Sequence, residues 1–329
     1  MASGTLHNPR RVDFVELGKQ NDGVPIAIIR LPQWWIPTAG FYALMTKTLL
    51  GLYAADKLCL TPVVDNWSGC PYEEDKRVHG TNIVFEYYFE PVSKVSLTSA
   101  LDSKSVAILS EESLDLGFVD FRTEWFRPND DLVNAFAECY RKYIHLNKIV
   151  KAQIEKAIQK RLDGKKTLGV HFRGTDYSIN ADSHPVALTI EDYFDEIDYA
   201  MKKMNFDQIF LATDDLNALK KFRERYKKVS FYPDAMRATG DKSVAFIHHD
   251  EVKLSHYRAG FEVIRDCLTL AACDGFIGSL SQVSLHVRIN RKSTGKDFEY
   301  IKVLEKGINH NNKNWIDIYN KQIKNAEKS

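Results

Sequence analysis

Apolar and polar residues alternate regularly along the second half of the chain. Short apolar runs, typical of strands buried on both faces, lie at 167–173, 208–215, 228–233 and 275–280. Segments with apolar residues at helical spacing lie between and after them, at 189–204, 217–226, 256–274 and 281–290. Strands that alternate with helices in this way predict an α/β domain with a doubly wound parallel sheet.

The first half carries the same alternation. Residues 23–32 form a short apolar run closed by a proline, a helical pattern runs from Phe41 to Tyr53, and 59–67 is a second strand candidate. Residues 81–93 and 106–112 are further strand or loop candidates. Two Rossmann-like domains facing each other across a cleft form the GT-B architecture, and this is the α/β fold that we predict.

The domain boundary is predicted within the polar, helix-rich stretch 129–162. It begins with an Asn or Asp cap and acidic residues and is rich in lysine toward its end, so it is one long helix or two helices that meet near Leu146 and Asn147. A chain of 329 residues fits two domains of ordinary size. We place them at 1–150 and 151–329, with a helix at 314–328 that can pack back on the first domain.

Composition narrows the class of protein. With 27% charged residues and a net charge of +1, the chain has the balance of a soluble globular enzyme and no bulk attraction for nucleic acid. Its five cysteines are scattered without a CxxC pair, which favours free thiols in a reducing compartment. The N-terminus has no apolar leader and the longest apolar stretch is too short to span a bilayer, so we expect a cytoplasmic protein, with attachment to a membrane surface left open.

Polar residues follow three predicted strands of the second half, where ligands of open α/β sheets bind. These residues are His171, Arg173 and Asp176; Thr213, Asp214 and Asp215; and Ser279, Ser281 and Gln282. The planar guanidinium of Arg173 suits phosphate oxygens, and the helix that begins after Ser281 favours an anion at its first turn. Asp214 or Asp215 can accept hydrogen bonds from a ribose or a base edge. The set predicts a nucleotide diphosphate site rather than a metal site.

Each of these groups alone also has a structural interpretation. A histidine at a strand end often only makes a structural hydrogen bond, and Asp214, Asp215 and Ser281 are good helix caps. Three groups at successive strand ends of one domain favour the functional interpretation.

The motifs that carry these residues resemble a known family. "GVHFRGTDY", "IFLATDD" and "GFEVIRDCLTLAACDGFIGSLSQVS" are similar, in order and spacing, to the donor-binding half of the fucosyltransferase superfamily. That superfamily contains the α1,6- and α1,2-fucosyltransferases, the nodulation fucosyltransferases and the protein O-fucosyltransferases. The resemblance covers residues 165–290 well and implies an inverting transferase that uses GDP-fucose.

The resemblance also implies a role for each matching residue. Arg173 corresponds to an arginine that contacts the β-phosphate, His171 lies near the diphosphate, and Asp176 completes their motif. Asp214 and Asp215 correspond to acids near the guanosine, and Asp266 corresponds to an acid that reads the guanine edge. Ser281 and Gln282 correspond to residues that hold the diphosphate.

The sequence departs from the family at two positions. A second arginine often follows the first in this superfamily, but here Gly174 follows Arg173. The α1,6 members place a glutamate, their supposed base, shortly after the motif, where this chain has Asp182. Asp182 is therefore the candidate base, and the alternative is a loop residue that faces water. Glu86 and Glu90 are other candidates, and a base is not obligatory if the acceptor hydroxyl loses its proton late.

The sequence also bears on a metal cofactor and on the acceptor. The chain has no Asp-x-Asp pair of the kind that holds Mn²⁺ or Mg²⁺ on a diphosphate, so we expect no metal and no other cofactor. Aromatic residues of the first half that lie beside strand ends or prolines are candidates for stacking on an acceptor glycan or glycolipid, with packing in the core as the alternative. They are Trp34, Trp67, Tyr72 and Tyr87.

Three functions stay open at this point. The first is a fucosyltransferase of polysaccharide or glycolipid biosynthesis. The second is a transferase of the same fold that uses another GDP-sugar, such as GDP-linked heptose or rhamnose. The third is a nucleotide-sugar-binding protein without catalysis.

Overall fold

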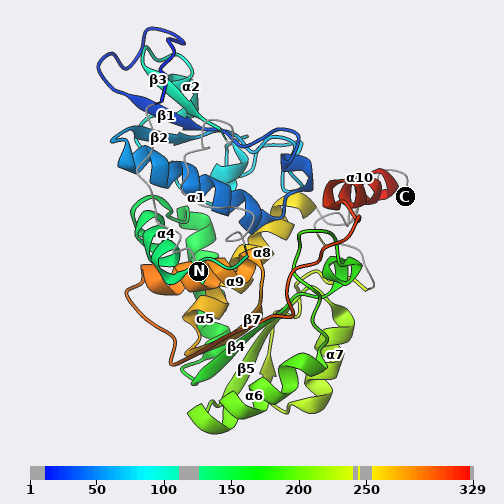
Figure 1. Cartoon of the computed structure of the whole chain (residues 1–329). Helices are drawn as coiled ribbons and strands as arrows, with labels where there is room; N and C mark the ends of the chain where they lie inside the picture. Colours follow the sequence, from blue (N-terminus) through cyan, green and yellow to red (C-terminus); the bar gives the residue numbers. More distant parts are fainter. Residues whose placement is uncertain (1–11, 111–125, 240–243, 245–253, 327–329) are drawn as a thin grey trace. The chain divides into compact units, whose positions relative to one another are not determined.

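The structure, a computed structural model, describes residues 12–110, 126–239, 244 and 254–326. The chain divides into two compact units, Met1–Val150 and Lys151–Ser329. Each unit contains a parallel sheet (Figure 1). Glu111 and Glu112, the end of the strand candidate 106–112, lie outside the described residues.

The first unit is built on a three-stranded parallel sheet in the order β2-β1-β3. Its strands are β1 (Ile26–Ile29), β2 (Thr61–Val64) and β3 (Val106–Leu109). The helix α1 (Phe41–Lys57) connects β1 to β2 and buries most of its residues. Gly51 allows α1 to lie close on β1, because a Cβ atom there would be 2.4 Å from Cγ2 of Ile29.

Short helices complete the first unit. They are η1 (Ile36–Thr38), η2 (Val84–Tyr87) and α2 (Leu97–Ala100). The segment 81–93 therefore forms a 3-10 turn and loops rather than a strand. The polar stretch 129–162 forms two helices, α4 (Asp130–Tyr143) and α5 (Lys148–Leu162), which confirms the second of the two alternatives. The break is capped, because Oδ1 of Asn147 accepts a hydrogen bond from the Val150 backbone at 3.0 Å.

The second unit contains a five-stranded sheet whose paired strands are all parallel, in the order β6-β5-β4-β7-β8. The strands are β4 (Thr167–Phe172), β5 (Gln208–Thr213), β6 (Val229–Ser230), β7 (Gly275–Ser279) and β8 (Tyr300–Leu304). The chain runs outward from β4 to β6 and then returns to β7 on the other side of β4. This order makes the sheet doubly wound, with its switch point between β4 and β7.

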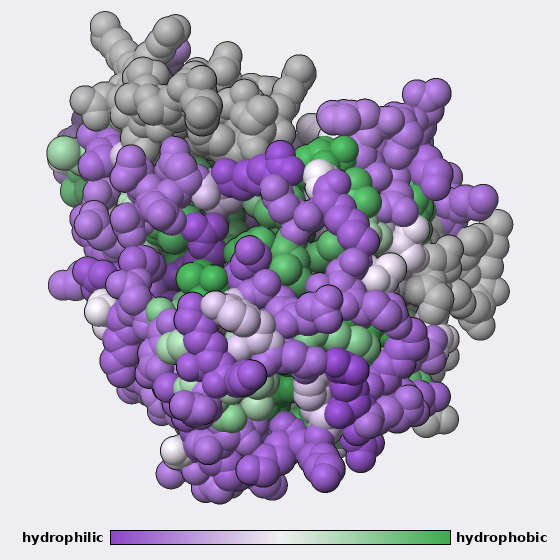
Figure 2. All heavy atoms as spheres, turned by 60° about the horizontal axis from the view of Figure 1, so that its bottom comes forward, coloured by the Kyte–Doolittle hydropathy of each residue, from purple (hydrophilic) through white to green (hydrophobic). Residues whose placement is uncertain are grey.

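Helices cover both faces of this sheet (Figure 1). They are α6 (Glu191–Met204), α7 (Leu216–Arg225), α8 (Ser255–Ala272) and α9 (Gln282–Ser293). The helix α10 (Trp315–Ala326) follows β8 in the chain and lies away from the sheet (Figure 1). Leu168, Val170 and Phe172 of β4 point into a core with α6 and α7. The intervening positions face α8 and α9, as expected from strand alternation. On the face that Figure 2 shows, hydrophilic residues cover most of the surface and apolar residues show between them.

The α/β class with parallel sheets that the sequence predicts is confirmed. The strand β8 was not predicted, because it is a half-exposed edge strand with Lys302 at its centre. Among the helices of the described residues, none combines the length and the apolar character that crossing a bilayer requires.

Candidate functional site

The candidate site lies at the carboxyl edge of the second unit's sheet, where Arg173 follows β4 and Asp214 follows β5. A guanidinium nitrogen of Arg173 (Nη1) lies 3.4 Å from Oδ2 of Asp214, and both side chains are partly exposed. The guanidinium also lies over the Tyr177 ring, 5.4 Å from its centroid. Arg173 is therefore held from two sides and remains accessible at the edge where ligands of such sheets bind.

Asp214 also fixes the backbone that follows Arg173. Its Oδ1 accepts the Gly174 N–H at 3.0 Å, and its Oδ2 accepts the Thr175 hydroxyl at 2.8 Å. Thr175 has a φ of 31°, a backbone conformation that is rare for residues with a side chain. The carboxylate thus stabilises a strained turn that directs Arg173.

The turn leaves no room for a side chain at Gly174. A Cβ atom there would lie 2.6 Å from Cβ and 2.7 Å from Oδ2 of Asp215. Asp215 cannot retreat easily, because its Oδ1 caps α7 by accepting the backbone N–H groups of Asn217 at 2.7 Å and Ala218 at 3.3 Å. The departure at Gly174, where a second arginine often stands, thus has a steric cause.

Thr213 and Asp215 have structural partners in this turn. Thr213 is buried, and its hydroxyl accepts the Asp215 N–H at 3.1 Å. Asp215 is the N-cap of α7, as the structural interpretation of the sequence predicted. Its neighbour Asp214 forms an ion pair with Arg173.

His171 is buried beneath the edge, on the side of the sheet that faces α9. Its Nδ1 lies 3.4 Å from Oγ of Ser284, and its backbone carbonyl accepts a hydrogen bond from the Tyr193 hydroxyl at 3.1 Å. Burial, with a smaller contribution from the Arg173 charge, lowers the pKa of His171 to about 3. The imidazole is therefore neutral at pH 7.

The third strand end joins the same edge through α9. Ser281 is the N-cap of α9, since its Oγ accepts the Ser284 N–H at 3.1 Å, and its hydroxyl also bonds to that of Ser284. Ser279 and Gln282 are buried beside it. Gly278, which pairs with His171, has no Cβ, and one would lie 2.6 Å from Oγ of Ser284. The first turn of α9 can therefore approach β4 closely.

Two further predicted residues, Asp176 and Asp266, belong to helices of the second unit. Asp176 belongs to the 3-10 helix η3 (Thr175–Ile179), and its side chain lies outside the described part of the chain. Asp266 is a partly buried residue of α8, and its burial raises the pKa of its carboxyl group to about 7. The charges of Arg265 and Arg237 act in the opposite direction, toward a lower pKa.

The candidate base Asp182 is engaged in a structural contact. Its Oδ1 accepts the Asn311 N–H at 2.8 Å and its Oδ2 accepts the Ser183 hydroxyl at 2.9 Å, and these bonds lower the pKa of Asp182. We define the C-terminal clasp as residues 307–315, which run along the loop 179–187. The contacts of Asp182 favour a role in the clasp over a role as a base.

Further contacts hold the clasp to the loop. Asn309 donates to the carbonyl oxygens of His184 and Pro185, each at 3.1 Å. The rings of His184 and Trp315 stack with centroids 4.0 Å apart. Lys313 Nζ donates to the Ile179 carbonyl at 3.0 Å, at the end of η3. The clasp thus anchors the loop that directly follows the Arg173 motif.

Three of the four aromatic residues expected to meet an acceptor lie in the core of the first unit. Trp67, Tyr72 and Tyr87 are at most 3% exposed, so this expectation is corrected: none presents a ring face to solvent. Trp67 and Tyr72 pack edge-on against Phe41, and the Tyr72 hydroxyl accepts the Phe41 N–H at 2.8 Å. Trp34 alone of the four is exposed, at 64%. The glutamate Glu86 accepts a bond from the Thr81 hydroxyl.

Several residues of the site region were missed in the sequence. Ser284 and Tyr177 lie within the quoted motifs without a recognised role. Arg258 and Glu262 contact each other on α8, and their spacing of four residues is a signal that could have shown them. Within the described residues, no group of three or more His, Cys, Asp or Glu side chains could hold a metal ion.

Known proteins resemble the chain in its motifs and in its fold. Residues 135–281 match the family model described as alpha-(1,6)-fucosyltransferase N- and catalytic domains. The fucosyltransferase NodZ from Bradyrhizobium superposes with a TM-score of 0.50 at 18% identity, over 81% of this chain and 91% of NodZ. POFUT1 in complex with GDP-fucose gives a TM-score of 0.50 at 14% identity, over 89% of this chain and 100% of POFUT1. No curated protein sequence matches the chain.

The two kinds of comparison show different things. At these identities the likeness to solved structures shows the fold, while the family model covers the segment that holds His171, Arg173, Asp214 and Asp266. Residues 135–281 are therefore similar to that fucosyltransferase family, and the chain has the GT-B-like α/β fold of NodZ and POFUT1.

Proposed function

We propose that the protein is an inverting, metal-independent glycosyltransferase that moves fucose from GDP-fucose to a glycan acceptor. The observation that carries the proposal is the accessible Arg173 guanidinium, oriented by Asp214 and Tyr177 at the edge of a doubly wound sheet. The family match over 135–281 and the fold shared with the GDP-fucose complex of POFUT1 support it.

In the proposed reaction the acceptor hydroxyl attacks the anomeric carbon of fucose from the side opposite to GDP. The bond between that carbon and the phosphate oxygen breaks, its electron pair leaves with GDP, and the hydroxyl proton goes to solvent or a base. Negative charge therefore grows on the β-phosphate in the transition state. Arg173, already fixed by Asp214, stabilises that charge without reorganisation.

Other residues act around this centre in the proposal. The N-terminus of α9, capped by Ser281, offers backbone N–H groups and a favourable dipole to the diphosphate. His171 acts as a neutral hydrogen-bonding group because its pKa lies far below 7. Asp266 accepts hydrogen bonds from the guanine edge. Trp34, exposed beside η1 of the first unit, is the proposed stacking surface for the acceptor.

The experiment is a donor screen on the purified protein. GDP-fucose, GDP-linked heptose, GDP-linked rhamnose and UDP-sugars are compared for thermal stabilisation and for release of the nucleotide diphosphate, with and without EDTA. A ligand at a hundred times its dissociation constant stabilises the folded state by about 2.7 kcal/mol. The expected result is stabilisation and turnover with GDP-fucose, unchanged by EDTA.

Three results would overturn parts of the proposal. If another GDP-sugar were turned over in preference to GDP-fucose, that sugar nucleotide would be the donor and the assignment of GDP-fucose would be wrong. Stabilisation by GDP-sugars with no turnover for any acceptor would make the protein a binding protein. Loss of activity in EDTA that Mg²⁺ or Mn²⁺ restores would refute the metal-independent mechanism.

A further inference from the structure

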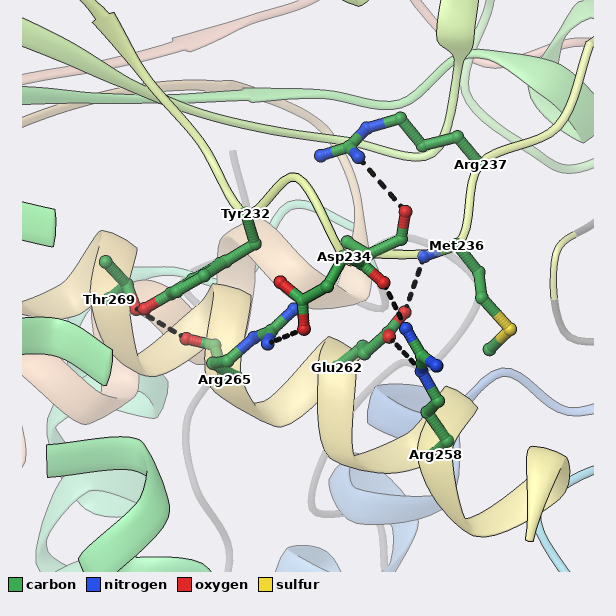
Figure 3. A network of polar contacts seen from close by, with 9 residues as sticks. Tyr232, Asp234, Met236, Arg237, Arg258, Glu262, Arg265 and Thr269 are labelled. Atoms are coloured by element: carbon green, nitrogen blue, oxygen red, sulfur yellow. Dashed lines mark hydrogen bonds and ion pairs between the residues drawn. The ribbon is translucent and has the colours of Figure 1, made fainter. Parts of the chain in front are cut away.

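Side chains from three successive turns of α8 form hydrogen bonds with the loop that follows β6, residues 232–238 (Figure 3). Glu262, which is buried, accepts the Met236 N–H at 2.7 Å with Oε2 and bonds to Nε of Arg258 at 2.7 Å with Oε1. Arg258 in turn donates to the backbone carbonyl of Asp234. The carboxylate and the guanidinium, four residues apart on the helix, thus hold the backbone of the loop.

The next turn of α8 holds the side chains of the same loop. Arg265 donates to Oδ2 of Asp234 at 2.8 Å, and its guanidinium lies 3.8 Å from the centroid of the Tyr232 ring. The Tyr232 hydroxyl shares a hydrogen bond of 2.8 Å with Thr269 (Figure 3). The loop is therefore fixed to the helix at both its backbone and its side chains.

The far end of the loop is fixed to the candidate site. The Ala238 N–H donates to the Asp214 carbonyl at 2.9 Å, and the Ala238 carbonyl accepts the Leu216 N–H at 3.0 Å. Asp214 is the residue that orients Arg173. Hydrogen bonds thus tie the segment 236–238 at one end to Glu262 and at the other to Asp214, the residue that orients Arg173.

Asp266 lies on the face of α8 that grips the loop. It follows Glu262 by four residues, a spacing that places two side chains on the same side of a helix. Within the described part of the chain its carboxylate has no hydrogen bond, while Arg237 of the loop and Arg265 of α8 interact with its charge. Arg237 of the loop and Arg265 of the same helix are therefore part of the electrostatic surroundings of Asp266.

We propose that Glu262 is a positioning residue for base recognition: it fixes the loop 232–238 around Asp266 and thereby sets the preference for guanine over other bases. The inference rests on the proposed function, because it takes the ligand to be a guanosine diphosphate. Guanine offers two N–H donors to a carboxylate, N1–H and the 2-amino group, whereas hypoxanthine offers N1–H alone. The difference in affinity between GDP and inosine diphosphate (IDP) therefore measures how much of the base selectivity depends on the position of the carboxylate.

The test compares dissociation constants for GDP, IDP and UDP by calorimetry in the full-length protein. The wild type is expected to bind GDP about tenfold more tightly than IDP, the effect of one hydrogen bond to a charged group. Glu262→Ala is expected to release the loop. The dissociation constant for IDP should then be at most about three times that for GDP. Glu262→Gln retains an acceptor for the Met236 N–H and keeps most of the ratio.

The matched control is Asp198→Ala. Asp198 bonds to Arg225 and Tyr226 between α6 and α7, on the other face of the sheet, so its loss removes a more exposed ion pair between helices without touching the loop. This variant is expected to keep the wild-type ratio even if its melting temperature falls. If Glu262 had only a structural role, Glu262→Ala would likewise keep the wild-type ratio of dissociation constants while its melting temperature fell.

The outcomes separate the inference from the proposed function. A folded Glu262→Ala variant that keeps the GDP to IDP ratio refutes the inference and leaves the proposed function standing. A wild type that binds UDP as tightly as GDP refutes the proposed function itself. Should Glu262→Ala fail to fold, Arg258→Ala, which removes the partly exposed half of the same grip, is expected to lower the ratio, and an unchanged ratio there refutes the inference.

Discussion

In each of the two sheets an arginine follows one strand and an aspartate follows the neighbouring strand, but the two pairs make different contacts. Arg30 directly follows β1 and Asp65 follows its neighbour β2, just as Arg173 follows β4 and Asp214 follows β5. In the first unit Nε of Arg30 lies 2.5 Å from Oδ2 of Asp65, while in the second the closest approach is 3.4 Å. Partial exposure is similar in both, so exposure does not distinguish them.

What differs is the chain that follows each arginine. Asp214 divides its oxygens between Arg173 and the Gly174–Thr175 turn, so the arginine is oriented by a carboxylate that also has other partners. Asp65 bonds to Arg30 and to the backbone N–H of Asn66, its own neighbour, and among the described residues it makes no hydrogen bond to the backbone that follows Arg30. In the proposed function only the second of these edges acts in catalysis, and the turn that Asp214 holds is the feature that distinguishes the two.

The largest expected effect concerns the aromatic core of the first unit. Trp67→Ala removes a ring that is 1% exposed and packs on Phe41 and Phe85, so the free energy of unfolding should fall by about 3–5 kcal/mol. Trp34→Ala is the matched control, since Trp34 is 64% exposed and its loss should change stability by less than about 0.5 kcal/mol. Urea denaturation of both variants measures the difference, and equal losses would contradict the assignment of Trp67 to the core.

The next effect tests the two arginines directly. Arg173→Ala should lower turnover of GDP-fucose about a hundredfold, because the stabilisation lost in the transition state is about 3 kcal/mol. Arg173→Lys should recover little of it, since the planar fork is lost. Arg30→Ala is the control, and its hydrolysis of GDP-fucose in the absence of acceptor should stay within about threefold of wild type. Near-normal turnover in a folded Arg173→Ala variant would refute the proposed site.

A smaller effect is expected for the two aspartates. Asp214→Asn keeps the shape of the side chain but weakens its bonds to Arg173 and the Gly174–Thr175 turn, so turnover should fall about tenfold, equivalent to roughly 1.4 kcal/mol. Asp65→Asn changes the corresponding pair and should leave donor hydrolysis unchanged. Steady-state kinetics on both variants, with circular dichroism as a check on folding, compare them. An equal loss in both would remove the distinction between the two edges.

The last expected effect is a pH dependence of stability, and it concerns the position two residues before each arginine. That position is Ile28 in β1 and the titratable His171 in β4. The pKa of His171 falls to about 3 in the folded protein, so between pH 6.5 and 3 the unfolded state binds a proton that the folded state does not. Stability from this residue is present above pH 6.5 and is lost as the pH falls, by up to about 1.4 kcal/mol per pH unit.

His171→Gln should remove this part of the acid sensitivity. Urea denaturation between pH 7 and 5 measures it as the difference in slope between wild type and variant. Parallel slopes would mean that the imidazole is not buried in its neutral form.

The fold of the second unit could be predicted because its strands are buried on both faces and its helices have one apolar side. Predicted strands at 167–173 and 275–280 correspond closely to β4 and β7. The strand β8 was not predicted from the sequence, because an edge strand with exposed positions has no apolar run. The strand at 228–233 is reduced to the two residues of β6, since the loop beyond it is held by α8 instead.

The candidate site could be predicted only in part. The residues at strand ends were identified because parallel strands bring their carboxyl ends to one edge. The clasp contact of Asp182 could not be predicted, because its partner Asn311 is 129 residues away. The burial of Trp67, Tyr72 and Tyr87 was missed because aromatic residues beside strand ends suit a binding surface and a core equally well. Only their packing around Phe41 distinguishes the two.

The clasp has a consequence for how the protein is made. Asp182 and Asn311 leave the ribosome 129 residues apart, so at 5–20 residues per second roughly 6–26 s pass between them. During that interval the loop after the Arg173 motif lacks the partners that Asn309, Asn311 and Lys313 provide. In a nascent chain the turn after Arg173 therefore lacks this anchor. The loop 179–187 can be fixed only after the clasp has been synthesised.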